Sequence, residues 1–365
     1  MPERKIEFDI SKFSKIKEDG QKFWDGNLQR PLIQAYLSGK GAQRQLSLKT
    51  ESEILSFFDE KLSSEGFVDI WGYKLSDLVF MGDGFPFIRP LLGSSAMAVY
   101  NDCNYVVDAN TIWFEPSRSL NLKDVQLRYN FDNIWFKRTL EIYATACKRW
   151  NGSVQPVITN IGGVFDILAM IIPSEQIVYA MYDQPEEIKR LTWQIHNIWW
   201  QYYDELSKAI LPYSIGYMDF WLPIPCQKPS FILQCDFCCL LSKKLFDEFV
   251  KPELEQSCRR LGGAMYHLDG PGAIRHLDSL LSIDNLKVIQ WVPGDGQKDV
   301  TEWPELYKKV RDAGKQLFIT GEGNCENFDK IVEILGSSEG LCYIASGDVR
   351  EHAKFEEWLK GYGVF

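Results

Sequence analysis

Apolar positions recur at helical spacing in the first part of the chain. After the capping box at residues 50–53, Ile54 and Phe58 fall on one face of an expected helix. Residues 67–125 are aromatic and irregular, and the Gly, Pro and Asp residues among them favour one strand and a long structured loop. We therefore predict an N-terminal helical extension over residues 1–65.

From residue 130 onward, short apolar runs alternate with longer helical patterns. One helix is expected over residues 130–150, and another begins at residues 183–185, with a buried stripe of Ile188, Leu191, Ile195, Ile198, Tyr202 and Leu206. The expected strands are residues 154–159, 214–218, 231–235, 264–268, 287–292, 316–320 and 341–345. One more strand between residues 67 and 110 makes eight. Eight strands that alternate with helices predict an α/β fold, a (β/α)8 TIM barrel, over residues 66–365.

The barrel prediction brings distant parts of the chain to one site. In a parallel barrel, the residues just after each strand line a common mouth at the carboxyl ends of the strands. These residues are Asn160, Asp219, Asp236, His267 with Asp269, Trp291, Glu322 and Ser346 with Asp348. We expect their side chains to face one site.

The stretch Tyr266-His-Leu-Asp-Gly-Pro-Gly272 is the strongest candidate for chemistry. His267 and Asp269 are two residues apart, so on an extended strand both side chains point to the same side. Such a pair can bind a divalent metal ion, or one member can orient or deprotonate a substrate. Alternatively, His267 is only a hydrogen-bonded barrel histidine, and Asp269 caps the helix that follows.

Asp236 leaves a second apolar strand toward the same mouth, within Cys235-Asp-Phe-Cys-Cys239. A structural zinc site normally needs two Cys-x-x-Cys pairs, and the sequence holds no second pair. We therefore expect Cys238 and Cys239 to be buried as small apolar residues, and we take Asp236 as a catalytic candidate.

Further candidates lie on loops. Asp83, a catalytic candidate, and Arg89, a substrate-binding one, belong to a Gly- and Pro-rich loop that either folds over the mouth or is only structural. Glu322 lies on a glycine turn that follows an expected strand. Its carboxylate could be a metal ligand or an acid, or it could simply be exposed to solvent. Asp219 and Trp221 could hold a cationic methylammonium group by cation–π attraction, or the ring could stack on a flat substrate or merely pack.

Composition narrows the class of protein. The net charge of −10 disfavours nucleic acids and anionic membranes as partners. The chain begins with charged residues and has no apolar run of the ~18 residues that a membrane span needs, so we expect a cytoplasmic protein. Nine scattered cysteines fit a reducing compartment. Phosphate-loop, dinucleotide-binding, HExxH and GxSxG motifs are absent, which excludes kinases, dehydrogenases, zinc proteases and serine hydrolases.

Five strings of the chain resemble the uroporphyrinogen decarboxylase superfamily, which includes cobalamin-dependent methyltransferases with the same barrel. Three of them, residues 82–98, 159–171 and 231–254, are similar to the superfamily at large. The other two, residues 266–278 and 288–296, resemble a decarboxylase-like branch found beside methylamine and methoxy metabolism.

The resemblance implies a methyltransferase that moves a methyl group between a small methylated substrate, a methylamine or methoxy compound, and a cobalamin. A partner protein would carry this corrinoid, because the chain lacks the Asp-x-His-x-x-Gly motif that binds it. Related thiol methyltransferases bind zinc through a His-x-Cys pair, which here is His267-x-Asp269, so a zinc site would be richer in oxygen. The remaining site residues would be Asp236, Glu322, Trp221 and Trp291.

Two other functions stay open. A cofactor-free decarboxylase would use Asp83 or Asp236 to protonate or stabilise an electron-rich ring while CO2 leaves. A corrinoid- or tetrapyrrole-binding protein would use the same mouth without turnover. The sequence leaves the substrate and the oligomeric state open, a dimer included.

Overall fold

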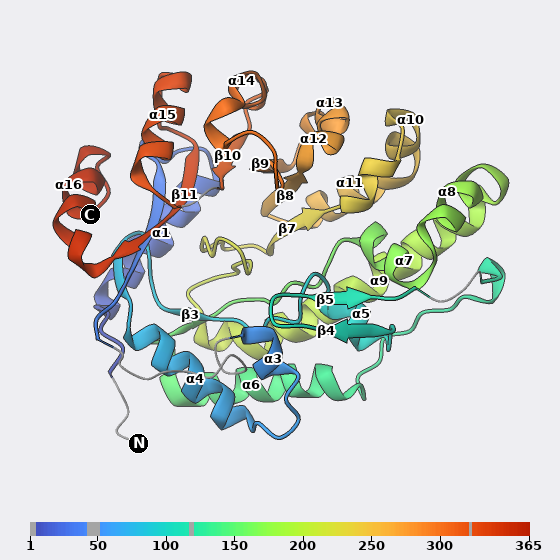
Figure 1. The fold of residues 1–365 in the computed structure, drawn as a ribbon, viewed down its shortest axis with the longest axis horizontal. Helices are drawn as coiled ribbons and strands as arrows, with labels where there is room; N and C mark the ends of the chain where they lie inside the picture. Colours follow the sequence, from blue (N-terminus) through green and yellow to red (C-terminus); the bar gives the residue numbers. More distant parts are fainter. Residues whose placement is uncertain (1–4, 42–51, 117–119, 321–322) are drawn as a thin grey trace.

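The computed structural model describes residues 5–41, 52–116, 120–320 and 323–365 (Figure 1). Its strands are β1 (Leu32–Ser38), β2 (Val79–Gly82), β3 (Phe87–Ile88), β4 (Tyr105–Val107), β5 (Ile112–Phe114), β6 (Gln155–Pro156), β7 (Ser230–Gln234), β8 (Gly263–Asp269), β9 (Leu286–Val292), β10 (Gln316–Ile319) and β11 (Leu341–Asp348). Its helices are α1 (Phe13–Trp24), α3 (Glu53–Phe57), α4 (Ser64–Ser76), α5 (Ala96–Tyr100), α6 (Ile134–Trp150), α7 (Val164–Ile171), α8 (Ser174–Asp183), α9 (Pro185–Ile210), α10 (Lys243–Leu245), α11 (Lys251–Arg260), α12 (Gly270–Ala273), α13 (Leu277–Leu281), α14 (Pro304–Asp312), α15 (Cys325–Leu335) and α16 (His352–Gly361).

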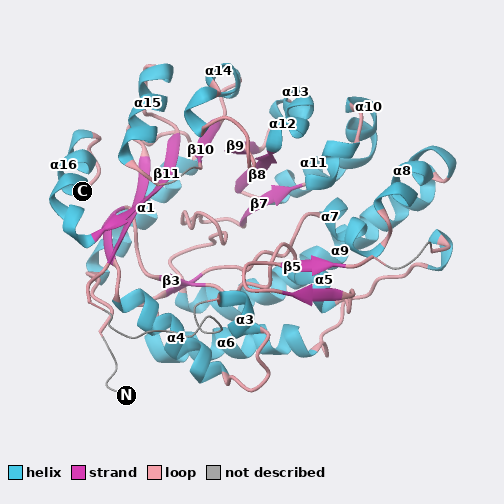
Figure 2. Cartoon of the chain, viewed as in Figure 1, coloured by secondary structure: helices cyan, strands magenta, loops and turns pink. Residues whose placement is uncertain are grey.

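The central sheet consists mainly of parallel strands. Its order is β2-β1-β11-β10-β9-β8-β7, and only β2, at one edge, runs antiparallel to its neighbour. Strands β7 and β8 are buried on both faces, as parallel strands covered by helices usually are. Figure 2 shows these strands as an inner arc with α10 to α16 outside it. The carboxyl ends of the parallel strands therefore meet at one edge of the sheet.

A second, two-stranded parallel sheet consists of β3 and β6. Just after β6, the Ile158 N–H donates to the Met218 carbonyl at 3.3 Å, so this segment lies beside the one that carries Met218. The hydrogen-bond ladders of the described residues thus join the parallel strands in two groups. The fold is mixed α/β with a central parallel sheet.

Strand β1 corrects the sequence-based prediction of a helical segment over residues 1–65. It pairs in parallel with β11 along its whole length, from Leu32 opposite Cys342 to Ser38 opposite Asp348. The helical prediction is wrong here because the strand is buried on both faces, and a buried apolar run has no alternation that distinguishes it from a helix. The predicted capping box begins outside the described residues.

Most other predicted elements are confirmed. The helix over residues 130–150 is α6, the helix from Pro185 is α9 with its predicted stripe buried, and the last five predicted strands are β7 to β11. Residues 214–218 were expected to form a strand, but Tyr217 makes only an isolated antiparallel bridge with Cys226. The Ser214 hydroxyl donates to the Gly216 carbonyl at 2.7 Å and folds the chain into a turn there. In place of one strand between residues 67 and 110, the structure has β2, β3 and β4.

Among the described helices, none is on its own long and apolar enough to cross a membrane. Helices α7 and α8 taken together are long and apolar enough by length and composition, but they are bent by 108° relative to each other. Five of the eight residues of α7 are buried inside the protein.

A little-exposed ion-pair network joins the N-terminal helix to the sheet. Arg30 donates two hydrogen bonds to Asp83, at 2.7 and 2.8 Å, and a third to Asp19 of α1 at 2.9 Å. Asp83 follows β2 and also accepts a hydrogen bond from the Ile33 N–H of β1 at 3.0 Å. The side chains of Arg30 and Asp83 are 12% and 8% exposed, so the pair is largely shielded from water.

We predict that Asp83→Asn destabilises the protein by about 3 kcal/mol, because the shielded Arg30 would lose the partner that accepts two of its hydrogen bonds and keep only Asp19 as an anionic partner. Urea denaturation measures the free energy of unfolding. The matched control is Asp132→Asn, whose parent side chain pairs with Lys137 and is 88% exposed. This control should change the free energy by less than about 0.5 kcal/mol. Equal effects of the two substitutions would contradict the role of the network.

Candidate functional site

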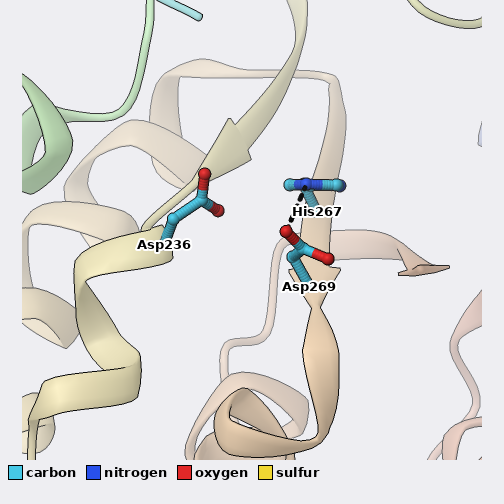
Figure 3. Close-up of side chains that lie close together, drawn as sticks. All are labelled: Asp236, His267 and Asp269. Atoms are coloured by element: carbon cyan, nitrogen blue, oxygen red, sulfur yellow. Dashed lines mark ion pairs between the residues drawn. The ribbon is translucent and has the colours of Figure 1, made fainter. Parts of the chain in front are cut away.

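Three side chains converge at the carboxyl ends of β7 and β8. One ligand atom from each of Asp236, His267 and Asp269 lies within 4.8 Å of the other two. In the part of the chain that the structure describes, no other group of three or more His, Cys, Asp and Glu side chains is so arranged. Figure 3 shows His267 and Asp269 on β8, with Asp236 at the start of the turn that follows β7.

The Asp269 carboxylate faces the site rather than capping a helix. Asp269 occupies the N-cap position of α12, yet its side chain makes no capping hydrogen bond. Its Oδ2 lies 3.9 Å from His267 Nε2 (Figure 3). Gly270 turns the chain with φ +73°, a conformation that glycine adopts without strain. The turn therefore leaves the carboxylate beside the imidazole.

His267 is buried and held on two sides. Its Nδ1 lies 2.6 Å from Gln290 Oε1 on β9, and its ring centroid lies 4.3 Å from that of Trp221. Only 7% of the side chain is exposed. Burial lowers the pKa of His267, so the ring is neutral near pH 7. A neutral imidazole can bind a metal ion or accept a proton.

Asp236 holds a proton more tightly than an ordinary aspartate. Burial of its carboxyl group among protein atoms, with the negative charges of Asp166 and Asp269 nearby, raises the pKa of Asp236 to about 8. The residue as a whole still reaches solvent. Near pH 7 this carboxyl group is therefore protonated more readily than an ordinary aspartate.

Asp166 is a site residue that sequence reasoning missed. It lies in the first turn of α7, is 6% exposed, and accepts a hydrogen bond from the Phe237 N–H at 2.9 Å. It thereby fixes the turn that starts with Asp236. Burial also raises the pKa of Asp166. The available signal was a single carboxylate within the apolar run Val164-Phe-Asp-Ile-Leu168.

Asp219 stabilises the turn that carries Trp221. Its Oδ1 accepts hydrogen bonds from the Trp221 and Leu222 N–H groups at 2.8 and 3.1 Å, which folds the turn that places the Trp221 ring on His267. Its Oδ2 is buried and has no hydrogen-bond partner among the described residues. Burial raises the pKa of Asp219 to about 6. Arg89 donates to the Phe220 carbonyl in the same turn, so it lies on this side of the site.

The remaining predicted site residues either lie apart from Asp236, His267 and Asp269 or fall outside the residues that the structure describes. Asp83 is engaged with Arg30 and Ile33. Trp291 is fully buried and packs on Trp303, with ring centroids 4.8 Å apart. Glu322 lies outside the described residues.

The cysteines near the site follow the sequence prediction only in part. Cys238 is buried, as expected, but Cys239 is exposed, because the 3-10 turn Asp236–Leu240 directs it outward. Asp348, the last predicted strand-end carboxylate, caps the 3-10 turn that follows β11 and pairs with Arg350.

A hollow of about 470 Å³ lies elsewhere, between α9 and α11. At its edge His196 Nδ1 lies 2.8 Å from Glu253 Oε1, and the Ser257 hydroxyl donates to the same oxygen at 2.8 Å. These three buried side chains satisfy one another across two helices. We interpret them as part of the helix packing.

Comparison with known proteins identifies the fold but no family. Models of protein families give no match, and no curated protein sequence matches either. Among solved structures, a methyltransferase from Methanosarcina mazei superposes with a TM-score of 0.60 and 10% sequence identity. The alignment covers 91% of this chain and 93% of the other. The two proteins therefore share a fold over nearly their whole length.

We predict that Asp219→Asn stabilises the protein at pH 8, by up to roughly 3 kcal/mol, because it removes a buried charge while keeping the Oδ1 acceptor. The folded-state pKa of about 6 lies above the ordinary value of 3.8, so the stability linked to the protonated carboxyl is lost as the pH rises through this window. The advantage of the Asn variant should therefore disappear below about pH 4.

The matched variant is Asp219→Ala, which leaves the Trp221 and Leu222 N–H groups without their acceptor. It should be less stable than Asp219→Asn at every pH. Urea denaturation between pH 4 and 8 measures both differences. A stability difference between Asp219→Asn and the parent that does not change with pH would contradict this account.

Proposed function

We propose that this protein is a methyltransferase that moves a methyl group between a small methylated substrate and a corrinoid carried by a partner protein. Asp236, His267 and Asp269 would bind a divalent metal ion, either zinc or another ion with similar ligand preferences. The observation that carries the proposal is the approach of these three ligand atoms to within 4.8 Å of one another. The shared fold with a methyltransferase supports it.

The side chains fit a metal ion in number and in kind. Imidazole nitrogen and carboxylate oxygen are both ligand types that zinc accepts, and three protein ligands leave a further position for a substrate atom, as in catalytic zinc sites. Two carboxylate charges also match the charge of a divalent cation. Asp166 fixes the turn behind Asp236, and Gln290 contacts the far side of His267. Such outer contacts are typical of metal ligands.

When bound, the ion supplies a Lewis acid that polarises the substrate heteroatom. Methyl transfer to a partner-borne corrinoid would break the carbon–heteroatom bond and leave its electron pair on the heteroatom, whose charge the ion held by Asp236, His267 and Asp269 would offset. Trp221 forms an apolar wall beside His267 that keeps water from one side of the reacting atoms. Asp219 holds this wall in place through its turn.

The donor set favours oxygen or amine substrates over thiols. Two carboxylates make the site harder than a His-x-Cys site, and hard sites activate thiols less well. We infer a methoxy compound or a methylamine as the methyl donor. Arg89, which is partly exposed and donates to the Phe220 carbonyl beside Trp221, is the polar side chain from which a substrate contact would come.

We further propose that β1, β3, β6 and β7 to β11 are the eight strands of a (β/α)8 barrel. They follow one another in chain order, and β1 already pairs with β11, the last strand. The corrinoid protein would dock at the carboxyl ends of these strands, where the three ligand residues lie. A cytoplasmic location agrees with nine cysteines that form no disulfide.

We predict that the purified protein holds one divalent metal ion per chain, which His267→Ala loses. Elemental analysis by mass spectrometry after dialysis gives the stoichiometry. The matched control is His352→Ala on α16, a half-exposed histidine away from the site, which should keep the metal. A parent protein that binds no divalent ion, even when one is added, would rule out the metal site.

The methyl transfer itself is tested by mixing the protein with cob(I)alamin and a panel of methylamines and aryl methyl ethers. We expect one class of donor to convert cob(I)alamin to methylcobalamin, as followed by absorbance, and Asp269→Asn to lower the rate at least tenfold. Tight cobalamin binding without turnover on any donor would point instead to a binding protein.

A second candidate function, a cofactor-free decarboxylase, is favoured by one observation. The pKa of Asp236 is raised to about 8, so its carboxyl group could donate a proton at neutral pH. A cofactor-free decarboxylase would still release CO2 from its substrate after the protein has been freed of metal. Activity that survives dialysis against a chelator would therefore favour the decarboxylase over the methyltransferase.

A further inference from the structure

We propose that Gln290 is a positioning residue that fixes the proton of His267 on Nδ1 and so turns the lone pair of Nε2 toward Asp236 and Asp269. The Gln290 Oε1 lies 2.6 Å from His267 Nδ1, which is a short hydrogen bond between these two atoms. An amide oxygen can only accept, so Nδ1 must donate. In a neutral imidazole the other nitrogen, Nε2, then carries the lone pair.

This arrangement opposes the one that the site would otherwise prefer. Asp269 Oδ2 lies 3.9 Å from Nε2, and the Asp236 carboxyl group lies on the same side. Without Gln290, the attraction of these oxygens would draw the ring proton to Nε2, where it would block the lone pair. Gln290 thus keeps the nitrogen that faces the carboxylates free for a ligand.

Gln290 is well placed for this role because its buried position gives its side chain few alternatives to His267 as a partner. It is 2% exposed and lies directly opposite His267 in the parallel register of β8 and β9. Paired residues of neighbouring strands direct their side chains to the same face of the sheet. Trp221 restricts the ring from its face, while Gln290 restricts it at its edge. Rotation of the imidazole away from the carboxylates would break the bond to Gln290.

This inference rests on the proposed metal-binding function for its purpose, but its central statement concerns a proton and can be tested without metal. The experiment uses the full chain, labelled with ¹⁵N-histidine and freed of metal. Long-range ¹H–¹⁵N spectra distinguish a ring nitrogen that bears a proton from one that does not. The chain has four histidines, and His267→Gln identifies the signals of His267 by their loss.

We expect His267 of the parent protein to show a protonated Nδ1 and a bare Nε2, and Gln290→Met to reverse the two signals. Gln290→Glu restores an acceptor at the same place and should keep the parent pattern. The matched control is Gln316→Met, which removes another buried strand glutamine, bonded to the Phe23 carbonyl at 2.7 Å. It should leave the His267 signals unchanged.

The functional readout is the affinity for Zn²⁺, measured by competition with a chelating dye. Gln290→Met should weaken binding by about 10- to 100-fold, as loss of an outer partner of a metal-binding histidine does, and Gln316→Met should not. If Gln290→Met does not fold, Gln290→Asn withdraws the oxygen by one methylene and serves in its place.

A parent-like pattern of His267 signals in Gln290→Met, or in Gln290→Asn where that variant replaces it, would overturn the proposal, whatever the metal does. A parent protein without metal affinity, but with the expected signals that reverse in the variant, would overturn the metal site and leave the role of Gln290 intact. The two failures are therefore distinguishable.

Discussion

The parallel register of β7, β8 and β9 is the constraint on which the site depends. It places Gln234, His267 and Gln290 side by side on three neighbouring strands. From this row, Gln290 contacts the imidazole directly, and Gln234 contacts Asp166, which holds the turn of Asp236. A shift of one residue in β8 would turn His267 to the opposite face and separate it from all of these groups. The backbone ladder therefore positions the site before any side chain does.

The elements that the sequence predicts best are those with a strong local pattern. Helix α9 has a long apolar stripe, and β7 to β11 are short buried runs between turns, so both follow from periodicity. Strand β1 was missed because a strand buried on both faces lacks alternation. Residues 214–218 have the composition of a strand, but the side-chain contact between Ser214 and Gly216 bends them. Such a contact depends on geometry and not on pattern.

The residues of the site divide in the same way, into those that a local sequence pattern marks and those that only distant contacts place. His267 and Asp269 could be placed together from sequence because their spacing on one strand is local, and Asp236 because strand ends converge in parallel folds. Asp83 was a candidate on a loop that could be catalytic or only structural, and its partner Arg30 comes from 53 residues earlier in the chain. Gln290 acts from a neighbouring strand, and no local pattern marks it. Contacts between distant segments are what the sequence alone does not reveal.

The charges of the site limit what it can do. Two full charges about 5 Å apart in a partly shielded site repel each other by roughly 3 kcal/mol, so the carboxylates of Asp236 and Asp269 favour a compensating positive group between them. One proton would neutralise a single carboxylate, and the resulting O–H could donate to the Nε2 of His267. One divalent cation would offset two carboxylate charges and engage Nε2 at the same time. If the contact with Gln290 at 2.6 Å keeps that nitrogen free, as proposed, a bound cation would engage all three side chains at once, whereas a proton would be shared between two of them.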